Sequence, residues 1–294
     1  MKTLDDAVIL AGGQGTRMLP ASLYTAKEVM PLIDTPIIHH LIWEACEAGV
    51  KRIHIVHSPS KRSQFKKIIK NINLNEFIEK RIDLPQSALN AVPLGIKLEL
   101  YEQKEPGGIG NAIASVIDYI NGPFLLILGD NLLINEHIGP EKLGPKNGSK
   151  SSKELVRYFL KHGTACVGIK SINQNDLNKY GVVALDGNLI KEIVEKPSIK
   201  NAPSTYILCG RYILLRDTKE LLKLYPKNKF GELQSIAIFN HHINNLGLGS
   251  VKLNKYDLYD SGDPISWLKS QIDHAIKRED LKEDILQWIE DKIK

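Results

Sequence analysis

A glycine-rich loop directly after a short apolar segment near the N-terminus constrains the fold of this chain more than any other feature. Residues 7–10 are apolar, and residues 10–20 read Leu-Ala-Gly-Gly-Gln-Gly-Thr-Arg-Met-Leu-Pro. Glycine lacks Cβ, so the backbone N–H groups of such a loop can come within hydrogen-bonding distance of a phosphate oxygen. Arg17 adds a planar guanidinium, and Lys27 adds an ammonium ten residues later. The pattern therefore predicts a strand that leads into a phosphate-binding loop.

Two better-known glycine motifs do not match this loop. A P-loop closes with Gly-Lys-Ser/Thr, whereas Gly15 is followed by Thr16 and Arg17. The dinucleotide fingerprint Gly-x-Gly-x-x-Gly opens a helix, but here the third glycine is missing and Pro20 follows closely. A plain glycine-rich turn with a surface arginine is the alternative, and Lys27 together with Arg17 favours phosphate binding over it.

Short segments rich in Ile, Val and Leu alternate with helical patterns in the first half of the chain. We predict strands over residues 7–10, 52–57, 97–101 and 124–128. We expect helices over residues 60–72 and 109–120, and one that begins at Pro36 with Thr35 as its N-cap. This alternation predicts βαβ units and a largely parallel sheet, with ligands bound at the carboxyl ends of the strands.

The second half of the chain is richer in strand patterns. We predict a helix over 151–161, helices over 217–224 and 232–245, and strands over 164–169, 181–185, 189–195, 206–215 and 251–258. Asp186-Gly187 indicates a hairpin turn, and residues 146–153 are the best candidate for a mobile excursion. From Asp263 onward, apolar residues at helical spacing predict two helices with one face packed on the body or on another subunit.

Length and charge limit the classes of protein that fit. A chain of 294 residues can bury a large core, as one α/β domain or as two tightly packed lobes. The net charge of +5 comes partly from the lysines of residues 61–70, which we interpret as a solvated helix face. No basic stretch with interleaved aromatic residues is present, so nucleic acid is not an expected partner.

The cysteine pattern and the apolar segments bear on the cellular compartment. Cys46, Cys166 and Cys209 lack the close spacing of a zinc or redox motif, and we interpret them as reduced core residues. The N-terminus has no apolar signal region, and no stretch approaches the roughly 18 apolar residues of a membrane span. We therefore expect no membrane association and a cytoplasmic location.

Two aspartates follow strand patterns and are candidate metal ligands. Asp130 comes after the apolar segment 124–128 and Gly129, and Asp260 follows the strand predicted near residue 258. Magnesium prefers a few carboxylates combined with phosphate oxygens, so these residues could share one Mg²⁺ with a bound nucleotide. The alternative for Asp130 is an ordinary cap on the following segment. Asp263 is better interpreted as the N-cap of the next helix.

Residues near three further strand ends or starts are candidate binding groups. Glu195 and Lys196 precede Pro197, which ends the strand, and they project into a cleft or into solvent. Gly181 and Gly210 leave bare backbone at which a ligand can approach, although a packing glycine or a bulge is an equally good interpretation of each.

The segment after the third predicted strand suits recognition of a base. Gln103 supplies a side-chain amide, and residues 106–111 read Pro-Gly-Gly-Ile-Gly-Asn, a turn that opens a helix. Alone, this turn would be only a helix start.

Taken in order, these motifs resemble one family. They are Gly-Thr-Arg-Met-Leu-Pro, Lys-Glu-Val-Met-Pro, Gly-Gly-Ile-Gly-Asn, Leu-Gly-Asp-Asn, Tyr-Gly-Val-Val, Val-Glu-Lys-Pro, Gly-Arg-Tyr and Asp-Ser-Gly, and they run from Ala7 to about Trp267. The chain resembles the bacterial-type UTP–glucose-1-phosphate uridylyltransferases, or UDP-glucose pyrophosphorylases, of the sugar nucleotidyltransferase family.

The resemblance implies the nucleotide-diphospho-sugar transferase fold. This is an α/β architecture with a Rossmann-like, mixed and mainly parallel sheet flanked by helices. One domain would span residues 1–294. Within it, residues 1–135 would bind the nucleotide, the β-rich residues 136–262 would bind the sugar, and residues 263–294 would form C-terminal helices.

The resemblance also implies a role for each matching position on the nucleotide side. The uridine would contact Ala11, Gly12, Gly13, Gln103 and Gly108. The triphosphate loop would be shaped by Gly15 and Thr16, and the catalytic pair Arg17 and Lys27 would hold the triphosphate and stabilise the departing pyrophosphate.

On the sugar and metal side, the resemblance assigns the remaining positions. Asp130 and Asp260 would bind Mg²⁺, and Asp130 would also contact the nucleotide. Lys196 would be the catalytic residue that binds the sugar phosphate. Glu195, Gly181 and Gly210 would line the hexose. The implied reaction is attack of glucose 1-phosphate on the α-phosphorus of UTP with release of pyrophosphate, in a dimer or tetramer.

Three departures from the family pattern are visible, and two other functions stay open. Ala21-Ser-Leu replaces a common Ala-Thr-Lys, Ser235-Ile-Ala replaces a Leu-Thr-Asp run, and Asn111 stands where relatives often carry His or Gln. A thymidylyltransferase that uses dTTP is one alternative, because uracil and thymine present the same hydrogen-bonding groups and differ only by a methyl group. A catalytically silent regulatory protein that binds nucleotide sugars is the other, and a guanylyl enzyme acting on mannose 1-phosphate is less favoured.

Overall fold

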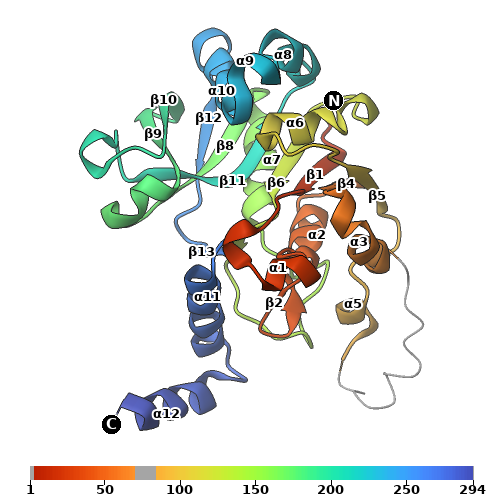
Figure 1. Cartoon of the computed structure of the whole chain (residues 1–294), viewed down its shortest axis with the longest axis vertical. Coiled ribbons are helices and arrows are strands. Elements are labelled where there is room, and N and C mark those ends of the chain that lie inside the picture. The colour runs from red at the N-terminus through yellow and green to blue at the C-terminus, as the bar shows by residue number, and fades with distance from the viewer. Residues whose placement is uncertain (1–2, 70–83, 294) are drawn as a thin grey trace.

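A nine-stranded mixed sheet forms the centre of the molecule (Figure 1), in a computed structural model that describes residues 3–69 and 84–293. The strand order is β5-β4-β1-β6-β11-β8-β12-β10-β9. These strands are β1 (Asp6–Ala11), β4 (Arg52–His57), β5 (Lys97–Glu102), β6 (Phe124–Leu128), β8 (Cys166–Ser171), β9 (Gly181–Asp186), β10 (Leu189–Glu195), β11 (Tyr206–Leu214) and β12 (Gly249–Lys252). Two small ribbons pair β2 (Pro31–Leu32) with β3 (Thr35–Pro36) and β7 (Asn131–Ile134) with β13 (Asp257–Asp260).

Helices cover both faces of this sheet. The helices of the described residues are α1 (Ala21–Tyr24), α2 (Ile37–Glu47), α3 (Arg62–Ile69), α5 (Gln86–Leu89), α6 (Gly108–Ala114), α7 (Ser151–His162), α8 (Thr218–Leu224), α9 (Lys227–Phe230), α10 (Gln234–Asn245), α11 (Pro264–Lys277) and α12 (Lys282–Ile293). The sheet is parallel across β5, β4, β1 and β6, and β11 then runs antiparallel to β6. The expected mixed α/β class is therefore confirmed.

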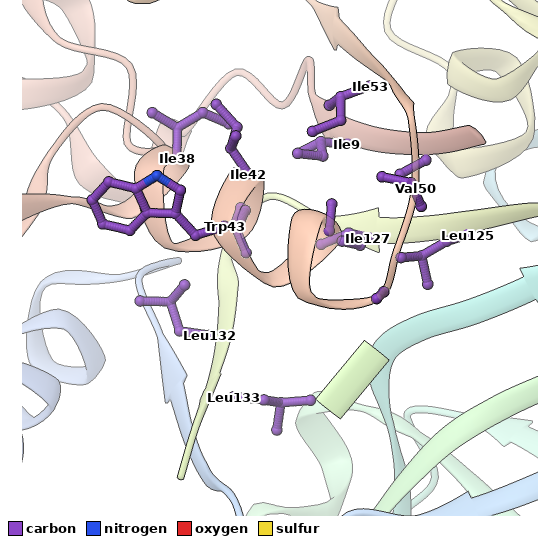
Figure 2. Packing of buried hydrophobic residues seen from close by; sticks show 14 of the residues in the cluster. Ile9, Ile38, Ile42, Trp43, Val50, Ile53, Leu125, Ile127, Leu132 and Leu133 are labelled. Carbon is purple, nitrogen blue, oxygen red and sulfur yellow. The ribbon is translucent and has the colours of Figure 1, made fainter. Parts of the chain in front are cut away.

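The alternation of side chains along each strand divides the core into two layers. Ile9 of β1 points to the face covered by α2 and α7, whereas its neighbour Val8 points to the face covered by α6 and α10. Figure 2 shows the first layer, where Ile9 and Ile127 of adjacent strands lie near Ile42 of α2. The apolar residues at positions 7–11 of β1 and throughout β6 are explained by this burial on both faces.

The first strands match their predictions, but the start of α2 does not. Thr35 and Pro36 form β3, Leu32 pairs with Thr35, and α2 begins at Ile37. The Thr35 hydroxyl donates to Asp34 and caps no helix N–H. The prediction of Thr35 as N-cap is wrong because the hairpin pairing takes up the two residues.

Two other predicted elements are divided in the structure. The helix expected over 109–120 is α6, followed by a separate short 3₁₀ turn at Ile117–Tyr119. The single strand expected over 251–258 is two strands, β12 and β13, with a turn between them. The division matters because β13 leaves the main sheet and pairs with β7, which places Asp260 opposite Asn131. The predicted helix over 60–72 extends beyond the described residues.

The segment expected to be a mobile excursion is anchored instead. Ser151 and Ser152 are fully buried, and both hydroxyls donate to the carboxylate of Glu44 in α2. Gly148 lies so close to the backbone of Trp43 that a Cβ there would come within 2.7 Å of it. The two serines at the end of this segment therefore make buried contacts, whereas Lys146, Asn147 and Lys150 are exposed.

The C-terminal helices extend away from the sheet (Figure 1). α11 packs on β13 and β2, and Asp263 is its N-cap, with a carboxylate that accepts from Ser266 N–H. α12 packs on α11, has no buried residue among those described, and leaves Trp288 59% exposed. The apolar face expected to pack on the body or on another subunit is therefore partly open to solvent in the single chain, with Leu268, Ile272 and Ile293 exposed. None of the helices in residues 3–69 and 84–293 has the length and apolarity needed to cross a membrane.

Candidate active site

The carboxyl ends of the four parallel strands meet at one edge of the sheet and deliver the predicted site residues there. Gly12 follows β1, and Gln103 follows β5. Asp130 lies two residues beyond β6, and the turn Pro59–Lys61 follows β4. Since parallel strands end at the same edge, segments far apart in the sequence converge on one cleft.

A cavity of about 430 Å³ lies against this edge. It is lined by Leu10, Gly12, Gly13, Gln14, Gly15, Thr16, Lys27, Glu28, Gln103, Pro106, Gly107, Gly108, Ile109, Ala112, Leu128, Gly129, Asp130 and Glu232. The glycine loop forms one wall and the start of α6 forms another. We call it the nucleotide cavity, because its size and its lining of loop amides, apolar side chains and a few polar groups suit such a ligand.

Gln103 is held at the base of the nucleotide cavity. Its side-chain Nε2 donates to Asn111 Oδ1 at 2.9 Å and approaches the Gly108 carbonyl at 3.4 Å. A Cβ at Gly12 would come within 2.4 Å of Gln103 Oε1, so any larger residue there would displace the Gln103 amide. Asn111 therefore orients the amide that we expect to read the base.

Gly108 requires glycine for two reasons. Its φ is +75°, in the left-handed region, and a Cβ would lie 2.9 Å from the Cα of Glu232. The close approach brings the turn Gly231–Leu233 beside the start of α6. Gln234 supports this contact because its amide donates to the carbonyls of Leu222 and Tyr225.

Lys27 and Asp130 form an ion pair in the nucleotide cavity. The Lys27 ammonium donates to Asp130 Oδ2 at 2.6 Å, and Lys27 is only 7% exposed. Burial alone would lower the pKa of Lys27, but Asp130 and then Glu28 outweigh it and raise that pKa. For Asp130, burial would raise the pKa, but the ammonium of Lys27 holds the pKa below its usual value. Both groups are therefore charged at neutral pH.

Asp260 is a second carboxylate close to Asp130. Burial and then repulsion from Asp130 raise the pKa of Asp260, although Gly262 N–H donates to it at 2.6 Å. Two carboxylates at one wall fit a divalent cation, and Asp260 forms no ion pair with any residue that the structure describes. Within residues 3–69 and 84–293, no cluster of three or more His, Cys, Asp or Glu side chains could hold a metal by itself. A cation here would need oxygens from a bound phosphate as well.

A second cavity of about 350 Å³ adjoins the first and shares Asp130 with it. We call it the sugar-side cavity. Its lining includes Arg17, Asp130, Lys179, Tyr180, Gly181, Glu195, Lys196, Tyr212, Glu232 and Asp260. Three basic side chains and four carboxylates thus face one space, which is suited to an anion bound beside a cation.

Lys196 has an unusual backbone conformation at the rim of the sugar-side cavity. Its φ is +46°, in the left-handed region that non-glycine residues rarely adopt. Its N–H donates to the Tyr180 carbonyl at 3.0 Å, so the end of β10 is fixed to the start of β9. Its side chain is 63% exposed, with Nζ 3.8 Å from Glu195 Oε1. Such strain is typical of side chains held in position for a ligand.

The structure brings most of the predicted residues to these two cavities. Those that line one or both are Gly12, Gly13, Gly15, Thr16, Arg17, Lys27, Gln103, Gly108, Asp130, Gly181, Glu195, Lys196 and Asp260. Arg17 lines the sugar-side cavity, on the side of Asp260, and not the nucleotide cavity as expected. Ala11 is fully buried at the end of β1 and Gly210 packs against Leu128, and neither is among the described residues that line these two cavities.

Sequence reasoning missed several residues of the site. Glu232 lines both cavities, and the departure from the family pattern near residue 235 was its only signal. Lys179 and Tyr180 directly precede Gly181 and had no separate signal. Lys61 was assigned to a solvated helix face, but it is buried behind the glycine loop. That assignment is wrong because Lys61 lies in the turn before α3.

The fold and these two cavities define the class, an α/β protein whose glycine-rich loop and charged side chains suit a nucleotide beside an anionic second ligand. The sequence profile of the family described as Nucleotidyl transferase matches residues 6–269, and the chain belongs to this family.

Relatives and solved structures are similar over almost the whole chain. A Bacillus subtilis protein named UTP–glucose-1-phosphate uridylyltransferase YngB is 28% identical over 300 residues, covering 100% of this chain and 97% of the relative. A UTP–glucose-1-phosphate uridylyltransferase of Streptococcus pyogenes is 28% identical, with 98% and 94% covered. A structure described as UDP-glucose pyrophosphorylase complexed with UDP-glucose is 27% identical with a TM-score of 0.74, covering 94% of this chain and 100% of that one. The UDP-glucose pyrophosphorylase of Acinetobacter baumannii has a TM-score of 0.81 at 24% identity, with 98% and 99% covered, and supports the fold.

Proposed function

We propose that this nucleotidyl transferase forms UDP-glucose and pyrophosphate from UTP and glucose 1-phosphate. The observation that carries the proposal is the junction of the two cavities at Asp130, with phosphate-binding groups on both sides. The names of the similar proteins, all concerned with UTP, glucose 1-phosphate or UDP-glucose, support this choice of substrates.

The chemistry requires positioning and positive charge more than a protein nucleophile. A phosphate oxygen of glucose 1-phosphate attacks the α-phosphorus of UTP, a new P–O bond forms, and the bond to pyrophosphate breaks. The glycine loop and Lys27 hold the triphosphate, while Arg17 and Lys196 hold the sugar phosphate. These charges bring two anions together and stabilise the leaving pyrophosphate, which is the main contribution in such a transfer.

Magnesium fits the carboxylates of the site. Asp130 and Asp260 would hold it together with nucleotide oxygens, and when bound it would supply charge neutralisation between phosphates. The raised pKa of Asp260 is consistent with this assignment, because a nearby cation would offset the repulsion from Asp130.

A substrate panel tests the proposed function. Pyrophosphate release would be measured with UTP, dTTP, CTP and GTP, each combined with glucose 1-phosphate and mannose 1-phosphate, with and without Mg²⁺. We expect the highest kcat/KM for UTP with glucose 1-phosphate and little release without the metal. A preference for dTTP would make the protein a thymidylyltransferase, and no release with any pair would contradict an enzymatic role.

Lys196→Ala is expected to raise the KM for glucose 1-phosphate by about tenfold or more, with a smaller change in the KM for UTP. The reason is that Lys196 faces the sugar-side cavity and is absent from the nucleotide cavity. Steady-state kinetics with each substrate varied in turn would measure both constants. Lys191→Ala is the matched control, since Lys191 is an exposed lysine of the same strand, β10. Equal KM values for wild type and Lys196→Ala would remove Lys196 from the site.

We infer, as predicted from the sequence, that residues 1–135 bind most of the nucleotide and that residues 136–262 bind most of the sugar. Glu232 is an addition, because it reaches the nucleotide cavity from the later region. The dimer or tetramer stays a prediction. The exposed apolar side chains of α11 and α12, such as Ile265 and Trp288, are the surface that we associate with it.

A further inference from the structure

Lys61 is a buried lysine behind the glycine loop. It ends the turn Pro59–Lys61 after β4, and its side chain is only 5% exposed, whereas Lys66 and Lys67 of α3 are exposed. Its ammonium donates to the Gly13 carbonyl at 2.5 Å and lies 3.4 Å from Glu28 Oε2. Burying a lysine is costly unless its donors are satisfied, so this position reflects a specific contact.

The planarity of the peptide bond converts this contact into an orientation of the next N–H group. The peptide between Gly13 and Gln14 is trans, so its C=O and N–H point in opposite directions. Gly13 and Gln14 line the nucleotide cavity, whereas Lys61 does not. With the Gly13 oxygen turned back toward Lys61, the Gln14 N–H is turned toward the cavity. Among the described residues, that N–H donates to no backbone carbonyl.

The segment that contains Lys61 and α3 also contacts the residues just before Lys27, the second phosphate-binding group of the nucleotide cavity. Gln64, in α3, accepts from Ala26 N–H at 2.7 Å and donates to the Tyr24 carbonyl at 3.2 Å. Ala26 directly precedes Lys27. Lys61 therefore fixes the glycine loop, and Gln64 fixes the backbone that leads to Lys27, from the same side. The contacts of this segment converge on the two phosphate-binding pieces of the cavity.

We propose that Lys61 is a positioning residue for the triphosphate of the nucleotide. It acts through the Gly13–Gln14 peptide, since it fixes the Gly13 carbonyl away from the phosphates and presents the Gln14 N–H to them. A carbonyl oxygen turned into the cavity would instead repel the phosphate oxygens. The proposal rests on the proposed function in that UTP is taken as the nucleotide.

Glu28 supplies the alternative explanation that a test has to separate. Glu28 is 1% exposed, and burial raises the pKa of its carboxyl against the opposing effects of Lys61 and Lys27. Lys61 could therefore serve only as the counter-ion of Glu28. Removing Lys61 would then harm the protein through an uncompensated buried carboxylate, with no special effect on the phosphates.

The experiment compares Lys61→Met, Glu28→Gln and the double variant with the wild-type protein, with Lys66→Met as an exposed-lysine control. Binding of UTP and of uridine is measured by calorimetry, and thermal unfolding is followed in parallel. We expect Lys61→Met to weaken UTP binding by about tenfold or more while uridine binding changes by less than about twofold, because only the phosphate contacts are lost. Lys66→Met should bind both ligands as the wild type does.

The double variant decides between the two roles of Lys61. Glu28→Gln removes the buried carboxylate, so the double variant should regain thermal stability, but its UTP binding should stay about tenfold weaker than that of Glu28→Gln alone. Recovery of UTP binding in the double variant would overturn the proposal and leave Lys61 as a counter-ion. Loss of UTP and uridine binding in equal proportion would overturn it as well. A wild-type protein that binds UTP but transfers nothing to glucose 1-phosphate would contradict the proposed function alone.

Discussion

Lys27→Met is expected to lower kcat by about 100-fold or more, because it removes a fixed positive charge from the position where charge develops on the leaving pyrophosphate. Lys27 is the ammonium that reaches the nucleotide cavity from the segment after α1, and Asp130 holds it there at 2.6 Å. Methionine keeps most of the volume of the side chain, so packing should be largely preserved. Steady-state kinetics with saturating UTP and glucose 1-phosphate would measure the change.

Two further properties of this variant separate a chemical role from a structural one. Without the ammonium, burial raises the pKa of Asp130, so any remaining activity should fall more steeply than wild-type activity as the pH is lowered. Lys104→Met serves as the control, since Lys104 is an exposed lysine next to Gln103. A kcat close to that of the wild type would exclude Lys27 from the transfer step.

Arg211→Met is expected to destabilise the protein by about 3–5 kcal/mol, because it breaks a buried ion pair and leaves the carboxylate of Glu44 uncompensated. Arg211, in β11, is fully buried and donates to both oxygens of Glu44 at 2.8 Å. The same carboxylate accepts from the hydroxyls of Ser151 and Ser152, so one group joins α2, β11 and α7. Urea unfolding followed by circular dichroism would give the free energy of unfolding.

A second substitution tests the reason given for this loss. In Arg211→Met with Glu44→Gln, the uncharged amide is less costly to bury, and it still accepts hydrogen bonds from the serines. The double variant should therefore unfold at a higher urea concentration than Arg211→Met. A free energy of unfolding for Arg211→Met within about 1 kcal/mol of the wild type would show that the pair contributes little.

The sequence allowed the parallel strands and their site to be predicted because both depend on local patterns. Strands buried on two faces are apolar throughout, as in residues 124–128, and their carboxyl ends must meet at one edge. Asp130, Gln103 and the glycine loop therefore come together as expected. The loop itself requires glycine for contacts that a sequence can indicate, such as the approach of Gln103 to Gly12.

The features that could not be predicted depend on tertiary contacts. Lys61 has the same residue type as the exposed Lys66, and only the position of the Gly13 carbonyl makes it a buried donor. Ser151 and Ser152 are typical of a loop, yet the buried Glu44 binds both of them. Gly210 was expected near the hexose, but its positive φ serves the packing of β11 behind Leu128.

The most direct test of the account follows the fate of the α-phosphorus of UTP. UTP labelled with ³²P at the α-position would be incubated with glucose 1-phosphate, Mg²⁺ and the wild-type protein, and the products would be separated by chromatography. We predict that the label moves into UDP-glucose and that unlabelled pyrophosphate appears in equal amount. Label that stays in UTP, or that appears in UMP or UDP without formation of a nucleotide sugar, would contradict the proposal that the two cavities joined at Asp130 carry out nucleotidyl transfer.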